Sequence, residues 1–199
     1  TLHEAAHGWV ANKLGDSTAK MLGRLSMNPI KHIDPIGTIV LPVAMLLMNT
    51  GFVFGWAKPV PVNMNNLKDP RKDMATVALA GPAANLLMAI GWTLIWKLSY
   101  MMPESAAWAA DPMRLMGQAG LLVNLIFMVL NLLPIPPLDG SRVLAWLVPA
   151  SIASKMDQME KYGIFIVITL LFLGLFEVVI LPMMNLVGAI LIQVINIPQ

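Results

Sequence analysis

The stretch that decides the fold is residues 74–102, MATVALAGPAANLLMAIGWTLIWKLSYMM, which contains a single charged side chain. It is longer than the roughly 20 apolar residues that an α-helix needs to cross a hydrocarbon core of about 30 Å. Residues 114–133 and 161–181 are further stretches of this kind, and a last apolar segment covers 183–197. Pro182 is expected to break the third span, because proline interrupts a helix interior. The sequence therefore predicts an all-α polytopic membrane protein.

The composition agrees with a lipid environment. Hydrophobic residues make up 57% of the chain, charged residues only 12%, and the mean hydropathy is +0.71. A soluble domain carries about one quarter charged residues, so this surface suits lipid better than water. The net charge of +2 is too small to indicate a nucleic-acid partner. There is no cysteine, so any metal must be bound by His, Asp or Glu.

The organisation of the chain predicts one domain over residues 1–199, since no repeat or low-complexity linker interrupts it. Residues 1–14 are predicted to form a helix closed by Gly15, and the chain opens inside that helix. We therefore expect a preceding transmembrane segment to be missing from this sequence.

Two basic loops predict the topology. Each carries four Lys or Arg: Lys13, Lys20, Arg24 and Lys31 in one, and Lys58, Lys68, Arg71 and Lys72 in the other. Because such loops collect on the cytoplasmic side, the apolar segment 36–55 between them is predicted to be a re-entrant hairpin, bent at Pro42 or near Gly51. The alternative is a straight crossing, which would put the two loops on opposite faces.

The candidate catalytic and metal-binding residues begin at the N-terminus, where His3-Glu4-Ala5-Ala6-His7 matches the pattern HExxH. On a helix the two histidines share one face and can bind one cation, while Glu4 can reach a water beside it. Three fixed positions occur by chance, and the alternative is a helix end with solvated polar side chains. However, ionisable residues in a membrane protein are costly unless they are used.

Two histidines leave a tetrahedral catalytic zinc one protein ligand short. The candidates for the third ligand are Asp16, His32, Asp34, Glu104, Asp111, Asp139 and Glu177. On the predicted topology, Asp139 follows the cytoplasmic end of 114–133, in a proline-rich break that can turn back toward the membrane. Asp139 is the best geometric choice.

A second motif lies far downstream of HEAAH, in the segment 131–140, NLLPIPPLDG. Together, the two segments resemble the site-2 protease family of intramembrane metalloproteases, because they match that family's HExxH and NxxPxPxLDG motifs at every specified position. Gly81-Pro-Ala-Ala-Asn85 resembles its GxxxN segment. Residues 54–62, FGWAKPVPV, and 28–35, NPIKHIDP, look like the compact branch that lacks a PDZ domain.

The resemblance implies one zinc ion per chain, bound by His3, His7 and Asp139, with Glu4 as the general base. It implies a zinc-dependent endopeptidase that hydrolyses peptide bonds within or near transmembrane segments of membrane proteins. The expected partners are a transmembrane protein substrate and the lipid bilayer. The basic loops suggest the cytoplasmic membrane of a bacterium, with the active site toward the cytoplasmic side.

Two asparagines are candidates for oxyanion stabilisation or for support of the zinc ligands, since buried amides need partners. These are Asn85 and Asn131. For Asn85 the alternative is helix–helix packing beside Gly81, and for Asn131 it is bracing of the proline-rich turn. Gly140 is expected to permit a sharp turn after Asp139.

The alternating prolines of residues 56–62 exclude a helix and predict a small membrane-associated extended or β segment. Such an edge strand can pair with an unwound substrate, and the candidate substrate-binding residues are Trp56, Lys58, Val60 and Val62. A plain connecting loop is the alternative. His32 is interpreted as a polar loop residue, with a flap residue or transient ligand as the alternative.

Two other functional classes use similar residues. A membrane metal transporter needs ionisable residues along a route across the membrane, yet the stretches 161–181 and 183–197 carry only Glu177. A metal-binding pseudoprotease would not need Glu4. The protease reading is therefore preferred.

Overall fold

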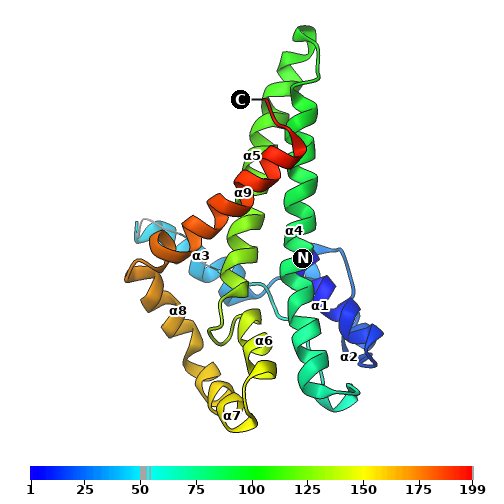
Figure 1. The fold of residues 1–199 in the computed structure, drawn as a ribbon, viewed down its shortest axis with the longest axis vertical. Coiled ribbons are helices and arrows are strands. Elements are labelled where there is room, and N and C mark those ends of the chain that lie inside the picture. Colours follow the sequence, from blue (N-terminus) through cyan, green and yellow to red (C-terminus); the bar gives the residue numbers. More distant parts are fainter. Residues whose placement is uncertain (50–52, 54, 199) are drawn as a thin grey trace. The chain divides into compact units, whose positions relative to one another are not determined.

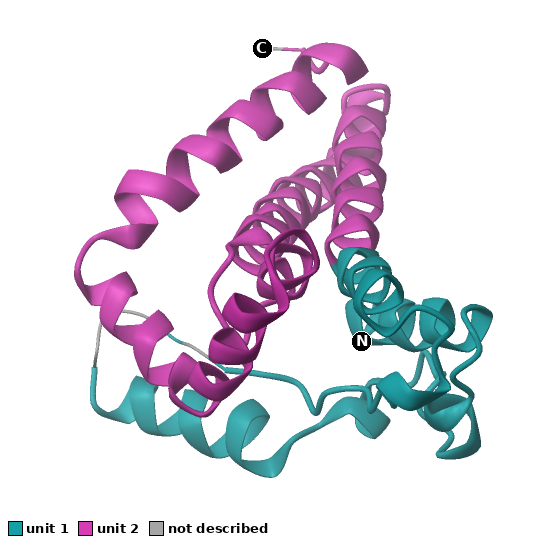
Figure 2. Ribbon diagram, turned by 60° about the horizontal axis from the view of Figure 1, so that its bottom comes forward, with its two compact units in different colours: residues 1–81 teal, residues 82–199 magenta. Residues whose placement is uncertain are grey.

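The computed structural model describes residues 1–49, 53 and 55–198, which form helices and helical turns with no β-strand among them (Figure 1). The chain divides into two compact units, residues 1–81 and 82–199 (Figure 2). The division falls inside a single long helix, α4 (Pro70–Ser99). The all-α prediction is confirmed, whereas the assignment of one domain stays a prediction.

The first unit is built from short helices that precede α4. They are α1 (Leu2–Lys13), α2 (Thr18–Met21), the 3₁₀ turn η1 (Pro29–His32), the π-helical turn η2 (Pro35–Val40), α3 (Leu41–Leu47) and the 3₁₀ turn η3 (Met64–Asn66). As predicted, α1 ends before Gly15, whose φ of +115° is available to glycine at low cost.

A buried carboxylate holds the ends of these short helices together. Asp16 is fully buried and accepts hydrogen bonds from the Thr18 N–H, the Thr18 hydroxyl, the Asn63 N–H and the Asn66 side-chain amide. Burial alone would raise the pKa of Asp16, but these donors outweigh it and hold the pKa below the ordinary value. Asp16 therefore links the end of α1 to the residues around η3 as a charged acceptor.

The apolar segment after residue 35 is helical but too short to span a bilayer. The helix Pro35–Leu47 is apolar and its 13 residues extend about 20 Å, against a core of about 30 Å. Pro42 lies inside this helix, just after the π-helical turn η2 gives way to α3, and the helix continues through it. The prediction of a bend at Pro42 is therefore wrong, and the alternative bend at Gly51 lies outside the described residues.

The two ends of segment 36–55 meet within the first unit. The Trp56 N–H donates to the Gly37 carbonyl at 3.1 Å, and the Thr38 hydroxyl donates to the Trp56 carbonyl at 2.8 Å. A Cβ on Gly37 would collide with the Trp56 indole, so glycine permits this close approach. Residues 37 and 38 therefore lie beside residue 56 within the first unit.

The second unit contains the remainder of α4 and the helices that follow it. These are the 3₁₀ turn η4 (Glu104–Ala106), α5 (Ala107–Leu132), α6 (Asp139–Leu147), α7 (Ala150–Met159), the 3₁₀ turn η5 (Glu160–Tyr162), α8 (Gly163–Phe172), the π-helical turn η6 (Phe176–Ile180) and α9 (Leu181–Ile195). Its apolar core includes Leu121, Leu125 and Val129 of α5, together with Ile180 and Met184. Close packing of α4 and α5 depends on Gly117 and Gly120, where a Cβ would collide with Trp96 and Trp92.

Among the residues that the structure describes, three helices are long and apolar enough to cross a membrane: Pro70–Ser99, Glu104–Leu132 and Phe176–Ile195. The first two confirm the spans predicted at 74–102 and 114–133. The third differs from the predicted 161–181, because the helix breaks at Gly174, with φ of +93°, and runs on through Pro182. Pro182 lies inside this helix, directly after the π-helical turn η6 gives way to α9.

The one charged side chain of the stretch 74–102 caps a helix. Lys97 donates from Nζ to the Ile195 carbonyl at 2.7 Å, at the C-terminal end of α9. A cation is favourable at this end, where the helix carbonyls lack partners. Lys97 therefore has a structural role within the second unit.

Candidate metal and catalytic site

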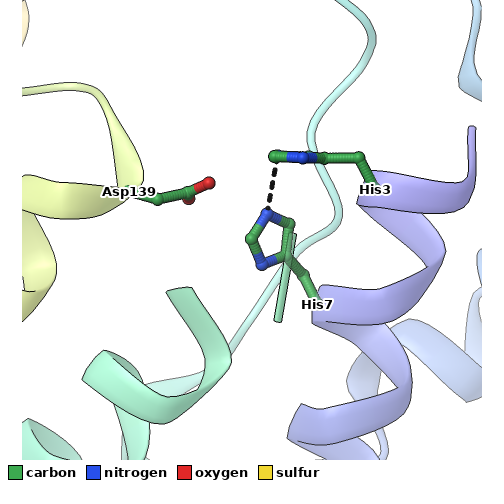
Figure 3. A group of neighbouring side chains, drawn as sticks. All are labelled: His3, His7 and Asp139. Atoms are coloured by element: carbon green, nitrogen blue, oxygen red, sulfur yellow. Dashed lines mark hydrogen bonds between the residues drawn. The ribbon is translucent and has the colours of Figure 1, made fainter. Parts of the chain in front are cut away.

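Two histidines on consecutive turns of α1 converge. The Nε2 atoms of His3 and His7 lie 3.0 Å apart, and their rings meet edge to face with centroids at 4.6 Å (Figure 3). Two nitrogens bound to one tetrahedral zinc at about 2.0–2.1 Å lie about 3.3 Å apart. The two rings therefore already have nearly the spacing that a shared zinc ion requires.

A backbone carbonyl fixes the orientation of one ring. His7 donates from Nδ1 to the Val77 carbonyl of α4 at 2.7 Å. Because a carbonyl only accepts, the proton of neutral His7 lies on Nδ1 and its Nε2 keeps a lone pair. A metal-binding histidine typically donates its other ring N–H in this way.

Gly81 provides the space for the two rings. A Cβ at this position would lie 2.5 Å from His3 Cε1, 2.5 Å from His7 Nε2 and 2.6 Å from His3 Nε2. Gly81 is one turn beyond Val77 on the same face of α4. Any side chain here would occupy the place of the imidazoles, so sterics requires glycine.

Glu4 follows His3 on α1 and is held by the extended segment. Its Oε2 accepts a hydrogen bond from the Val60 N–H at 3.1 Å. The same carboxylate is therefore next to the histidine pair and fixed by a backbone donor from a distant part of the chain. His3, Glu4, His7 and Val60 all belong to the first unit.

Residues 55–63 are neither helix nor strand, so the exclusion of a helix over 56–62 is confirmed, while the predicted edge strand is not seen among them. The N–H groups of alternate residues point to acceptors within the first unit: Trp56 to Gly37, Lys58 to His32 and Val60 to Glu4. Trp56 and Lys58 are exposed, and Val60 and Val62 are half-buried. The row of donors that includes Val60 is thus occupied by the protein itself.

The candidate third ligand is in the second unit. Asp139 is the first residue of α6, directly after the proline-rich turn, and its carboxylate is half-buried (Figure 3). The next residue, Gly140, is buried, and a Cβ there would collide with the Leu132 carbonyl at the end of α5. The glycine is therefore needed for this close approach to α5, and not for the sharp turn that the sequence predicts.

The two candidate asparagines differ in their surroundings. Asn131 donates from its side chain to the Phe127 carbonyl one turn earlier in α5, at 2.9 Å. Asn85 is 2% exposed, and its side-chain nitrogen has no hydrogen-bond partner among the described residues. A buried amide donor without a partner is costly, so Asn85 has a donor available for another group.

Most of the other candidate ligands are engaged elsewhere. Asp16 is saturated by its four donors, Asp34 accepts from the Ile36 and Gly37 N–H groups, and Asp111 pairs with Arg114. His32 is buried with Nε2 bonded to the Ser26 carbonyl at 2.8 Å, which fits a structural loop residue. Glu104 and Glu177 are exposed.

The sequence did not reveal the roles of Gly81 and Val77. The only signal was that Gly81 opens the GxxxN resemblance, which says nothing of which side chains it faces. The contact between His7 and Val77 joins residues 70 positions apart, and no local pattern marks it.

Comparisons with known proteins relate the chain to a metalloprotease family. The family profile "Peptidase family M50" matches residues 98–175. The chain is 42% identical over 186 residues to "Putative zinc metalloprotease YwhC" of Bacillus subtilis, covering 93% of this chain and 81% of that protein. No solved structure gave a significant match.

Mycobacterial relatives carry a similar name. The chain is 31% identical over 175 residues to "Putative zinc metalloprotease Rip2" of Mycolicibacterium smegmatis, covering 85% of this chain and 62% of that protein. For Rip2 of Mycobacterium tuberculosis the identity is 32% over 144 residues, or 72% and 51% of the two chains. The chain thus spans about half to three fifths of these two relatives. Because the chain is 42% identical to the Bacillus protein over 93% of its own length, it belongs to peptidase family M50, the site-2 proteases.

Proposed function

We propose that this chain is the core of a zinc-dependent endopeptidase that cleaves peptide bonds within or near transmembrane segments of membrane proteins. The observation that carries the proposal is the histidine pair, whose Nε2 atoms lie 3.0 Å apart with Glu4 as the residue after His3. The three helices apolar enough to cross a membrane support a substrate that is itself embedded in lipid.

One zinc ion per chain would be held by His3, His7 and Asp139, each of which offers one ligand atom. The fit rests on the spacing of the two imidazoles, on the carbonyl that fixes His7, and on the space left by Gly81. Two histidines and one carboxylate are a usual catalytic ligand set, and the fourth position stays open. When bound, zinc supplies Lewis acidity, which polarises a carbonyl and acidifies water.

The residues of the chain perform the proton transfers. Glu4 takes a proton from the attacking water, whose oxygen bonds to the scissile carbonyl carbon. As the C–N bond breaks, Glu4 returns that proton to the leaving amine. The open donor of Asn85 supports a role in stabilising the developing oxyanion. The bond from Asn131 to Phe127 instead supports bracing of the turn before Asp139.

The experiment that tests the function uses the purified full-length protein. We expect about one zinc per chain and cleavage of single-span test substrates, with no cleavage of soluble peptides of the same flanking sequence. Asp139→Asn should weaken zinc binding by at least about 100-fold, because losing a direct ligand costs more than the 10–100-fold typical of its supporting residues. Zinc affinity is measured by chelator competition.

Asp111→Asn is the matched control. Asp111 lies in the same unit and its carboxylate is exposed beside Arg114, so zinc binding should be unchanged. Zinc retained at wild-type affinity by Asp139→Asn would contradict the ligand assignment. Cleavage of soluble peptides as readily as of single-span substrates would contradict the substrate class.

We also propose that the protein lies in the cytoplasmic membrane of a bacterium with its active site toward the cytoplasm. The equal positive charge of the loops 13–34 and 56–73 supports this orientation. The hydrogen bond that joins Trp56 to Gly37 supports a hairpin over a crossing, since the ends of a crossing segment would lie about 30 Å apart.

Cysteine labelling gives the test of this topology. The chain has no native cysteine, and Lys20 and Lys68 are exposed. In intact cells, Lys20→Cys and Lys68→Cys should both resist a membrane-impermeant reagent and react only after permeabilisation. Reaction of one position but not the other would mean that the segment 36–55 crosses the bilayer.

A further inference from the structure

Val60 meets α1 through both its backbone and its side chain. The Val60 N–H donates to Glu4 Oε2 at 3.1 Å. One turn along, a Cβ on Gly8 would lie 3.1 Å from Val60 Cγ1, so the side chain rests against the bare backbone of Gly8. Glu4 and Gly8 share one face of α1. The contact therefore fixes Val60 over that face and not only at one atom.

The sequence around Val60 leaves it as a solitary donor. Pro59 and Pro61 have no N–H, and their rings fix φ near −65°. Within residues 59–61 the Val60 N–H is thus the only backbone donor, in a stretch with little freedom to rotate it away. Glu4 receives one defined hydrogen bond instead of a choice among several.

Both sides of this stretch are anchored within the first unit. Toward the N-terminus, the Lys58 N–H donates to the His32 carbonyl at 2.9 Å, and the Arg24 guanidinium contacts the carbonyls of Lys58 and Pro59 at 3.5 and 3.4 Å. Toward the C-terminus, the Asn63 N–H donates to Asp16 Oδ2 at 2.7 Å. Asp16 is fully buried, which makes its anchor the stronger one.

We propose that the Val60 backbone amide positions the carboxylate of Glu4, and that Asp16 is the positioning residue that keeps Val60 in place. A charge-assisted hydrogen bond to Oε2 restrains the carboxylate and leaves Oε1 for the water. This inference rests on the proposed function, in which Glu4 is the general base. It also assigns the Val60 N–H to the enzyme's own base, where the sequence had suggested pairing with substrate.

The kinetic test removes the N–H while controlling for the side chain. Val60→Pro loses both the N–H and the packing on Gly8, whereas Val60→Ala loses only the packing. We expect kcat of Val60→Pro to be about 10- to 100-fold below that of Val60→Ala, the effect of one charge-assisted hydrogen bond. KM should agree within about twofold, because substrate binding is untouched, and zinc content should be equal. Equal kcat values in the two variants would overturn the proposal.

Hydrogen exchange tests the contact without any activity. In the full-length protein, the Val60 amide should exchange at least about tenfold more slowly than in Glu4→Ala, which removes the acceptor. Asp16→Asn should also speed this exchange and lower kcat with little change in KM. Identical exchange at Val60 in wild type and Glu4→Ala would show that Glu4 does not hold this amide, and would overturn the proposal.

The two measurements separate this proposal from the function on which it rests. Wild-type protein that cleaves no substrate would refute the proposed function, while the exchange rates would still decide whether Val60 holds Glu4. Conversely, Glu4→Gln could lose activity while Val60→Pro and Val60→Ala have equal kcat values. That result would support the proposed protease function and refute the positioning role of Val60.

Discussion

Glu4→Gln should retain zinc and lose turnover by about 10²- to 10⁴-fold, the range typical of a lost general base. Glu4 is not among the three proposed ligands, so chelator competition should give the wild-type zinc affinity. Glutamine keeps an oxygen that can accept from the Val60 N–H. The side chain therefore stays in place, and the loss reports on basicity. The measurement is kcat on a single-span substrate that the wild type cleaves.

Glu104→Gln serves as the matched control for this variant. Glu104 is exposed in η4 of the second unit, and the same substitution there should leave kcat within about twofold of wild type, as is usual for surface changes. Near-normal turnover by Glu4→Gln would show that another group takes the proton from water. The proposed mechanism would then be wrong even if zinc is bound as described.

The membrane-spanning helices show what hydropathy can and cannot predict. Residues 74–102 and 114–133 were found because apolar length is a local property of the sequence. The third span was misplaced because the break depends on backbone conformation at Gly174, where φ is +93°. Proline is the stronger breaker on local grounds, yet the helix Phe176–Ile195 continues through Pro182, which comes directly after the π-helical turn η6.

The candidate site residues show the same division between local and long-range information. His3 and His7 were predictable because helical spacing alone puts them on one face. The bonds from Val60 to Glu4 and from His7 to Val77 join residues 56 and 70 positions apart. Such pairs depend on how the helices pack, which no periodicity encodes.

Hydrogen bonds show what the other carboxylates do that the sequence had offered as possible third ligands. Asp16 and Asp34 had the right chemistry for a third ligand, and only their hydrogen bonds reveal other roles. Asp16 is the clearer case, since its carboxylate is enclosed by donors from Thr18, Asn63 and Asn66. A charge in such a setting stabilises the fold around it and has no free position for a metal.

Gly81→Ala should abolish high-affinity zinc binding and, with it, peptidase activity. The added Cβ would lie 2.5 Å from His3 Cε1 and from His7 Nε2, distances that require one or both rings to move. Displaced rings cannot keep their spacing of 3.0 Å. Because both imidazoles are proposed ligands, the expected loss of zinc affinity is at least about 100-fold, beyond that seen for residues that only support a ligand.

Gly91→Ala is the control for helix propensity, since it makes the same substitution in the same helix. A Cβ at Gly91 meets nothing within 4 Å, and replacing glycine by alanine inside a helix stabilises it by about 1 kcal/mol at either position. The control should therefore keep wild-type zinc affinity and activity. Since both variants gain helix propensity, a difference between them isolates the collision with the imidazoles. If Gly81→Ala binds zinc as tightly as Gly91→Ala, the two rings do not need the space beside α4, and the metal site is not the one described here.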